Sequence, residues 1–174
     1  MNIILLGAPG AGKGTQGKKI SKEFNIPHIS VGELLRESDA YTLFKGFMDL
    51  GELVPNHLVE EVVLQRLEAE DCEKGFILDG YPRTLEQACR FYKHIDAVID
   101  LQVSSSIAKR RLVQRGREGE SMKVVDRRLS VYKENANSIS DHYRYLRKSI
   151  IVAASDDPDM IYDTIRTFLE VCKV

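Results

Sequence analysis

Short runs of apolar residues recur along the chain and give the first indication of its fold. Four of these runs do not alternate with polar residues, which is typical of parallel strands buried on both faces. They occupy residues 3–6, 76–78, 97–101 and 150–154, and His28–Ser30 is a weaker fifth candidate. The pattern therefore predicts a five-stranded parallel sheet with helices packed on both of its faces.

Helical periodicity fills the segments between the predicted strands, and the last helix is the best marked. Ile161 and Ile165 lie four residues apart, on one face of that helix. Asp157 can cap its first turn, and Pro158 suits the first helical position because a proline has no N–H to bond. Strands that alternate with helices predict an α/β fold in which ligands bind at the carboxyl ends of the strands.

Residues 31–54 do not fit a simple crossover from one strand to the next. They contain two helical stretches, and a break at residues 49–51 comes before Pro55. We interpret this segment as a small excursion from the core. A length of 174 residues suits one compact domain and is short for two. We therefore expect a single domain, 1–174, that includes the excursion.

The composition argues against several classes of protein. No apolar run approaches the roughly 20 residues that span a bilayer, and the first residues lack the basic leader of a signal peptide. We therefore expect a cytoplasmic protein. The three cysteines and four histidines show neither disulfide nor metal-ligand spacing. A formal net charge of −1 gives no general attraction to nucleic acid.

Basic residues concentrate between positions 109 and 128, where eight basic side chains accompany three acidic ones. Arg111 and Arg115 lie on the same side of a predicted helix as its apolar residues, so we expect both to point inward. Arg128 borders the apolar stripe of a following helix, whereas Arg127 lies on its opposite side. We predict that Arg128 reaches a binding site and that Arg127 is a solvent-exposed charge.

A glycine-rich loop follows the first predicted strand. Residues 7–13 have the spacing G-x-x-x-x-G-K between a strand and a helix, which is the context of a phosphate-binding loop. Glycines let backbone N–H groups turn toward phosphate oxygens, and the helix N-terminus adds a favourable dipole. Lys13 supplies a mobile positive charge. Gly14 replaces the usual serine or threonine and Thr15 follows it, so Asp79 is the nearest candidate carboxylate for magnesium.

Two motifs together resemble those of the adenylate kinase family of nucleoside monophosphate kinases. The first is the loop G-A-P-G-A-G-K-G-T at residues 7–15, and the second, more specific motif is L-D-G-Y-P-R-T at residues 78–84. Supporting matches are V-G-E-L-L-R at 31–36, G-E-L-V at 51–54 and Gln87. The likeness covers essentially the whole chain and implies a three-layer α/β/α fold of the P-loop NTPase type.

The resemblance implies a role for each matching residue. The implied donor-binding set is Gly10, Ala11, Gly12, Lys13, Gly14, Thr15, Arg111 and Arg115. The implied acceptor-binding set is Val31, Arg36, Glu52, Leu53, Val54, Gly80, Tyr81, Pro82, Arg83, Gln87, Arg117 and Arg128. The implied catalytic set is Lys13, Arg83, Arg115, Arg117 and Arg128. The resemblance also implies that ATP is the donor and that Mg²⁺ arrives with the nucleotide, with Asp79 as an indirect contact and no metal site of the protein's own.

A cleft rich in arginine suits phosphoryl transfer between two nucleotides. By the resemblance, Arg36 and Arg83 hold the acceptor phosphate, and Arg117 and Arg128 lie between donor and acceptor. Guanidinium groups bind phosphate oxygens in pairs and stay cationic, so they offset the repulsion between two polyanions. A nucleotide phosphate has a second pKa near ~6 and is largely dianionic at pH 7, so the reaction needs no catalytic base.

Two departures from the family pattern bear on specificity. Val31 stands where adenylate kinases usually carry threonine, so a hydroxyl near the acceptor base is missing. Arg115 and Arg117 are separated only by Gly116, so the mobile lid is reduced to a vestige at about residues 115–121. Because a lid excludes water from the transferred group, we expect weak selectivity for the donor base and measurable hydrolysis of ATP.

The sequence thus predicts a nucleoside monophosphate kinase that converts ATP and AMP reversibly into two ADP. A UMP or CMP kinase with the same core is one alternative, because those enzymes also lack the hydroxyl missing at Val31. A catalytically degenerate nucleotide-binding relative is a second, which the shortened lid favours and the retained Lys13 and Arg83 oppose. A small-molecule hydroxyl kinase is a third. We expect a monomer whose partners are small-molecule nucleotides.

Overall fold

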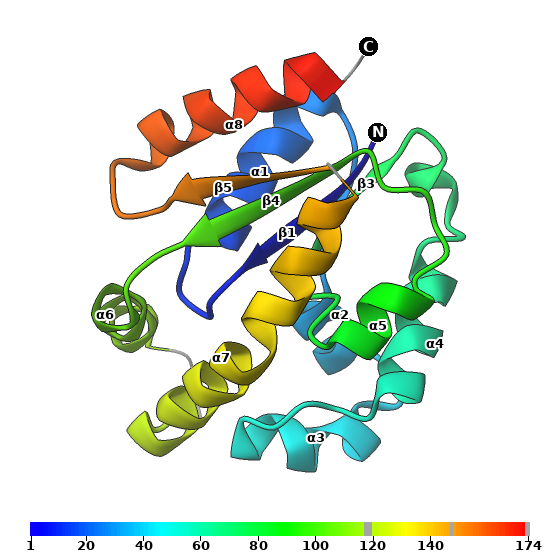
Figure 1. Ribbon diagram of the computed structural model, residues 1–174. Coiled ribbons are helices and arrows are strands. Elements are labelled where there is room, and N and C mark those ends of the chain that lie inside the picture. Colours follow the sequence, from blue (N-terminus) through cyan, green and yellow to red (C-terminus); the bar gives the residue numbers. More distant parts are fainter. Residues whose placement is uncertain (117–119, 147, 173–174) are drawn as a thin grey trace.

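The computed structural model describes residues 1–116, 120–146 and 148–172. Its centre is a five-stranded parallel sheet with the strand order β2-β3-β1-β4-β5 (Figure 1). The strands are β1 (Asn2–Gly7), β2 (His28–Ser30), β3 (Phe76–Asp79), β4 (Ala97–Gln102) and β5 (Ser149–Ala153). The predicted five-stranded parallel sheet is confirmed.

Helices connect the successive strands, as the alternating pattern predicts. They are α1 (Lys13–Phe24), α2 (Val31–Glu37), α3 (Tyr41–Leu50), α4 (Asn56–Arg66), the 3-10 turn η1 (Glu70–Cys72), α5 (Leu85–Arg90), α6 (Ser105–Arg115), α7 (Met122–Tyr145) and α8 (Pro158–Cys172). The two helical stretches expected in the excursion are α2 and α3. None of the described helices has the length and apolar character that a membrane span requires.

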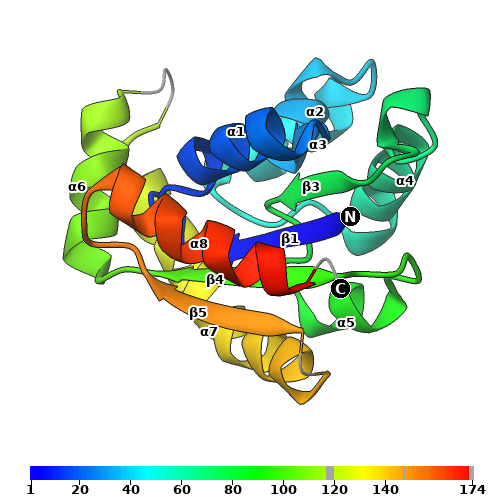
Figure 2. The same cartoon turned by 90° about the horizontal axis from the view of Figure 1, so that it is seen from above.

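Two apolar layers hold the helices against the sheet. On one face, Ile3 packs in a cluster with Ile20 of α1 and Ile165 of α8. On the other face, Ile4 packs in a second cluster with Ile139 of α7. Successive side chains of a strand point to opposite faces, which is why neighbouring residues of β1 belong to different layers. Figure 2 shows α1 and α8 on one side of the sheet and α5 and α7 on the other, so the fold has three layers.

The edge strand β5 differs from its prediction. Val152 is buried, but Ile151 is 46% exposed, so the prediction that this strand is buried on both faces is wrong. The reason is its place in the sheet, where it pairs with β4 and forms the outer edge. A strand at an edge has a neighbour on one side only, and the helical layers cover it less completely than they cover a central strand.

The start of α8 follows the predicted signals. The Asp159 N–H donates to Oδ1 of Asp157 at 2.8 Å, and the Ile161 N–H donates to the Asp157 carbonyl oxygen at 3.1 Å. Asp157 therefore caps the helix, as its sequence position predicts. Ile161 and Ile165 are both buried against the sheet.

The register of the central strands places the ends of β1 and β3 side by side. Leu5 of β1 pairs with Asp79 of β3, and Ser30 of β2 pairs with the same aspartate. On the other side, Gly7 of β1 pairs with Leu101 of β4. The glycine-rich loop therefore leaves the sheet between β3 and β4, with Asp79 beside it, as expected for a site at the carboxyl ends of the strands.

Candidate active site

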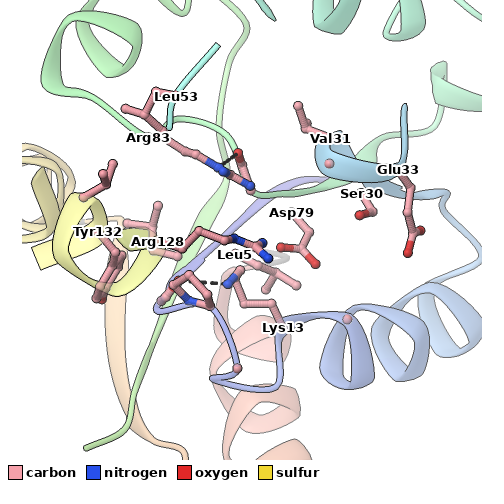
Figure 3. Close-up of a pocket in the computed structure, with 18 of the residues that line it drawn as sticks. Leu5, Lys13, Ser30, Val31, Glu33, Leu53, Asp79, Arg83, Arg128 and Tyr132 are labelled. Atoms are coloured by element: carbon pink, nitrogen blue, oxygen red, sulfur yellow. Dashed lines mark hydrogen bonds between the residues drawn. The ribbon is translucent and has the colours of Figure 1, made fainter. Parts of the chain in front are cut away.

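A cavity of about 620 Å³ opens at the carboxyl ends of the strands. The phosphate loop, α2, the residues after α3, the end of β3 and parts of α6 and α7 line it (Figure 3). Clefts at this place in α/β folds bind ligands. The lining includes every described residue of the predicted site except Ala11 and Tyr81, and Arg117 lies outside the described residues.

The phosphate loop connects β1 to α1 through backbone that requires glycine, as Gly10 shows. Gly10 has a φ of +85°, and a Cβ built there would lie 2.5 Å from the carbonyl oxygen of Ala108. A side chain would therefore force the loop away from α6. The N-terminus of α1 has no side-chain cap, so N–H groups of its first turn are available to an anion.

Lys13 lies at the start of α1 and bridges its own loop. Its Nζ donates to the carbonyl oxygens of Gly7 at 2.8 Å and Ala8 at 3.0 Å. Desolvation lowers the pKa of Lys13, and the neighbouring charge of Asp79 partly opposes this effect. Figure 3 shows Lys13, Asp79 and Arg128 around the same part of the cavity. An anionic ligand here would compensate the cost of burying the ammonium group.

Asp79 is paired with a histidine that sequence reasoning missed. His28 Nε2 lies 3.5 Å from Oδ2 of Asp79, and the two side chains are 10% and 12% exposed. Burial by itself raises the pKa of Asp79, but His28 and Lys13 outweigh it and hold that pKa below its ordinary value. A Cβ on Gly17 would lie 2.4 Å from the imidazole ring, so α1 fixes the ring's position. The sequence places His28 on a predicted strand, and the pairing of that strand with β3 is what brings the histidine to Asp79.

Two arginines predicted to hold the acceptor phosphate converge beside Gly32. A Cβ built on Gly32 would lie 3.6 Å from a terminal nitrogen of Arg36 and 3.9 Å from one of Arg83. Arg83 Nε donates to the Gly80 carbonyl oxygen at 2.8 Å. Desolvation in the cleft and the charge of Arg128 lower the pKa of Arg83 to about 10, so it stays cationic at neutral pH. Cations held this close together suit a phosphate ligand.

The arginines of α6 and α7 reach the cavity from its other side. Arg111 Nη1 donates to the Ala154 carbonyl oxygen at 2.8 Å. Arg115 Nη2 donates to both carboxylate oxygens of Glu120, at 2.9 and 2.6 Å, and Arg128 donates to the same carboxylate. The Glu120 side chain is only 5% exposed. A buried carboxylate therefore holds two arginines that the sequence predicts on phosphates, and no role for it was predicted.

The wall predicted to face the acceptor base is mostly apolar. Val31 is 2% exposed, and Leu53 and Val54 also line the cavity. Gln87 supplies an amide whose Oε1 accepts the Arg83 N–H at 2.6 Å.

The same amide of Gln87 donates from Nε2 to Oδ1 of Asn56 at 2.9 Å. Asn56 in turn donates to Oε2 of Glu86 at 2.7 Å. These two bonds fix which end of each amide is the donor. Sequence reasoning missed Asn56, which is the first residue of α4.

Two members of the predicted site do not contact the cavity. The Tyr81 side chain is 2% exposed and packs edge-on against Phe91, with ring centroids 5.5 Å apart. The side chain of Ala11 is buried in the core on the α1 face. Burial of these two side chains among apolar neighbours stabilises the fold more than exposing them in the cavity would. Their neighbours Pro82 and Gly12 line the cavity instead.

Arg127 is exposed to solvent, as predicted, but it also makes an ion pair that the sequence did not show. Its side chain is 43% exposed, but Nε and Nη2 donate to Oε1 and Oε2 of Glu52 at 2.6 and 3.0 Å. Helical periodicity places Arg127 on the outer side of α7, and it cannot show that the excursion folds back to meet that side. Glu52, predicted to face the acceptor base, therefore accepts hydrogen bonds from Arg127 with both of its carboxylate oxygens.

Among the described residues, no group of three or more histidine, cysteine, aspartate or glutamate side chains could hold a metal ion. Asp79 nevertheless fits a supporting role. A Cβ on Gly14 would lie 4.0 Å from Asp79 Oδ2, so the carboxylate lies beside the phosphate loop. Mg²⁺ keeps several waters and binds through phosphates and one or two carboxylates, which matches one aspartate at this place.

Comparison with known proteins decides the family. The family model described as adenylate kinase matches residues 5–148, which include the motifs at 7–15 and 78–84. The chain belongs to the adenylate kinase family. The resemblance inferred from the two motifs is thereby confirmed.

Individual adenylate kinases match over nearly their full length. That of Mycobacterium sp. (strain MCS) is 39% identical over 169 residues, which cover 90% of this chain and 93% of that protein. That of Corynebacterium urealyticum is 40% identical over 156 residues, with 83% and 86% covered. That of Archaeoglobus fulgidus is 36% identical over 218 residues, with 99% and 100% covered. This last alignment is longer than the 174 residues of this chain, so the archaeal adenylate kinase has additional residues within it.

Proposed function

We propose that this member of the adenylate kinase family transfers the terminal phosphoryl group of ATP reversibly to AMP and forms two ADP. Family membership makes the chain a phosphotransferase with a phosphate group as acceptor. The observation that carries the proposal is the convergence of arginines on one cavity from two sides. Arg36 and Arg83 come from the acceptor side, Arg115 and Arg128 come from the other, and Lys13 lies beside Arg128 and Asp79 in the same cavity.

On the donor side, the phosphate loop and Lys13 bind the triphosphate of ATP. The ammonium of Lys13 exchanges its loop carbonyls for phosphate oxygens, which restores the partners lost on burial. Arg115 exchanges Glu120 for the same anion. Arg111, held beside Ala154, contacts the adenine. Mg²⁺ carried by the nucleotide would neutralise part of the phosphate charge, and Asp79, beside the phosphate loop, would be the residue that supports it.

On the acceptor side, Arg36 and Arg83 hold the monophosphate dianion as the nucleophile. Arg128 then lies between the two phosphate groups and stabilises the charge that moves from donor to acceptor. No catalytic base takes part, because the acceptor phosphate is already ionised at neutral pH. Val31, Leu53 and the amide of Gln87 contact the acceptor base. The amide has both a donor and an acceptor with which to hydrogen-bond adenine, which an entirely apolar wall would lack. This favours AMP as the acceptor.

The connection that would carry a lid over the donor end of the site is short. α6 ends at Arg115 and α7 begins at Met122, so the connection that would carry a lid consists of residues 116–121. A connection of this length is too short for a lid domain with its own core. We therefore infer weak discrimination between ATP and GTP, and slow release of phosphate from ATP when no acceptor is present. Strict use of ATP with negligible phosphate release would contradict this inference.

A coupled assay for diphosphate formation with AMP, UMP and CMP tests the proposal. We expect AMP to be preferred and the variants Lys13→Ala and Arg83→Ala to lose about 10²–10³-fold in turnover, as for removal of one charge-stabilising donor. Lys22→Ala, an exposed lysine in the last turn of α1, is the matched control. Full turnover in both site variants would refute the site. Preference for UMP or CMP, or nucleotide binding without turnover, would establish one of the alternative functions.

We also infer that the protein works as a cytoplasmic monomer with small nucleotides as its partners and without nucleic acid. The support is that one chain supplies the donor and acceptor sides of the cavity. Light scattering on the purified protein at assay concentration gives the mass directly. A dimer mass at that concentration would refute the monomer.

A further inference from the structure

We propose that Glu52 and Arg127 form a latch that holds the acceptor side of the cleft closed, and that Arg127 is a positioning residue for the acceptor. The inference rests on the proposed function for the identity of that acceptor. Arg127 lies on α7, Glu52 follows α3, and 75 positions separate them in the sequence. Nε donates to Oε1 at 2.6 Å and Nη2 donates to Oε2 at 3.0 Å. Two such parallel bonds fix orientation as well as distance.

The backbone beneath the latch is in direct contact with α7. Gly51 follows α3 with a φ of +75°, and a Cβ built there would lie 2.9 Å from the Val124 carbonyl oxygen. The same Cβ would lie 3.1 Å from Cγ of Arg128. A residue with a side chain would push the excursion away from the helix. The ion pair therefore forms the outer rim of a close contact between the excursion and α7.

The latch connects two walls of the cavity. Leu53, directly after Glu52, lines the acceptor side, and Arg128, directly after Arg127, lines the opposite side. Figure 3 shows Leu53, Arg83 and Arg128 around one part of the cavity. When Glu52 holds Arg127, the apolar wall and the Arg128 guanidinium are placed at a fixed separation. An acceptor that fits between them then finds both parts of its site already arranged, which reduces the ordering cost of binding.

The ion pair between Glu52 and Arg127 is weak enough for the excursion to move away from α7. The two side chains are 43% and 37% exposed, and ion pairs of this exposure are weak and screened by salt. The hydrogen bond from Arg127 lowers the pKa of Glu52, so the carboxylate is ionised at neutral pH. Glu134 lies 3.7 Å from Nη1 of Arg127 and keeps the guanidinium on the outer side of α7. The pair can therefore bias the excursion toward closure without preventing entry of the acceptor.

The first test compares steady-state kinetics of the wild type, Arg127→Ala and the charge-swapped variant that combines Glu52→Arg with Arg127→Glu. We expect the KM for AMP to rise about threefold to fivefold in Arg127→Ala, in line with exposed ion pairs, with kcat and the KM for ATP nearly unchanged. We expect the charge swap to restore the KM for AMP in part, because Glu134, which lies 3.7 Å from Nη1 of Arg127, repels the new carboxylate at that position. In about 0.5 M salt the wild type and Arg127→Ala converge, because screening removes the pair.

Lys123→Ala is the matched control for Arg127→Ala. It removes the same charge from α7 one helical turn earlier, and its exposed side chain makes no hydrogen bond or ion pair within the described part of the chain. An equal rise in the KM for AMP in this control would overturn the latch, because the effect would then come from net charge. Equal rises in the KM values for AMP and ATP would overturn acceptor positioning.

Amide hydrogen exchange without nucleotide separates failure of the latch from failure of the proposed function. We expect faster exchange in α3 of Arg127→Ala than in the wild type or in Lys123→Ala. Unchanged exchange in α3 overturns the latch whichever monophosphate is used. If the wild type does not turn over AMP, the proposed function fails. In that case the exchange comparison still decides whether the pair holds the excursion against α7.

Discussion

Replacing Glu120 by glutamine removes the anion that Arg115 and Arg128 share. Glutamine has nearly the same volume as glutamate, so the change isolates the contribution of the charge. In the free protein the Glu120 carboxylate is buried and accepts hydrogen bonds from both arginines. Without it, two guanidinium groups lie close together with no shared counter-charge. We expect the free protein to become less stable.

The size of the effect follows from the exposure of the three side chains. Hydrogen bonds to charged groups contribute about 1.5–3 kcal/mol when buried, whereas exposed ion pairs contribute about 0.2–1 kcal/mol. Glu120 is 5% exposed, but Arg115 and Arg128 are 40% and 21% exposed, so this arrangement lies between the two limits. We expect a loss of about 2 kcal/mol in the free energy of unfolding, or roughly 4–8 °C in Tm for a chain of this size.

ATP should reverse most of that loss, because its phosphates supply the missing anion. Calorimetry of wild type and Glu120→Gln, with and without ATP, measures this. The expected result is a lower Tm for the free variant and a larger rise in Tm on adding ATP. Glu61→Gln, at an exposed position on α4, is the control. A variant as stable as this control would refute the electrostatic argument, and equal rises with ATP would show that the arginines do not exchange Glu120 for phosphate.

Three further substitutions test other parts of the site. Val31→Thr puts a hydroxyl at a position that is 2% exposed, so we expect a loss of about 1–2 kcal/mol in unfolding free energy. We also expect the KM for AMP to fall relative to the KM for CMP; an unchanged ratio of these two KM values would show that residue 31 does not contact the base. Asn56→Ala removes one of the two hydrogen bonds that orient the Gln87 amide and leaves only the bond from the Arg83 N–H, so the KM for AMP should rise more than that for ATP; equal rises would contradict the role of Gln87. Asp79→Asn should destabilise the protein at pH 7, because an acid whose pKa is lower in the folded state stabilises the fold at pH values above its unfolded-state pKa. The difference in unfolding free energy between wild type and variant should shrink below about pH 4, as the carboxylate becomes protonated. Urea unfolding of both proteins between pH 7 and about pH 3 measures this difference, and a difference that does not change with pH would contradict the prediction.

Much of the fold was predictable because the relevant signals are local. A central parallel strand buries both faces and therefore reads as a continuous apolar run, as in β1, β3 and β4. The same run in β5 misled the prediction, because the composition of a strand does not reveal whether it has neighbours on both sides. The cap of α8 at Asp157 depends on residues two positions apart, so the sequence showed it directly.

The sequence by itself determined the phosphate loop and the side of α6 that carries Arg111 and Arg115, because each depends on spacing within one element. Arg36 and Arg83, in contrast, were expected on the acceptor from the family resemblance alone. Only the tertiary structure decided which carboxylates meet the basic side chains around the cleft. Glu52 reaches Arg127 across 75 positions, and His28 reaches Asp79 across adjacent strands. Periodicity gives the direction of a side chain relative to its own helix. The partner depends on how the excursion and the helices pack around the cleft, which is a property of the whole chain.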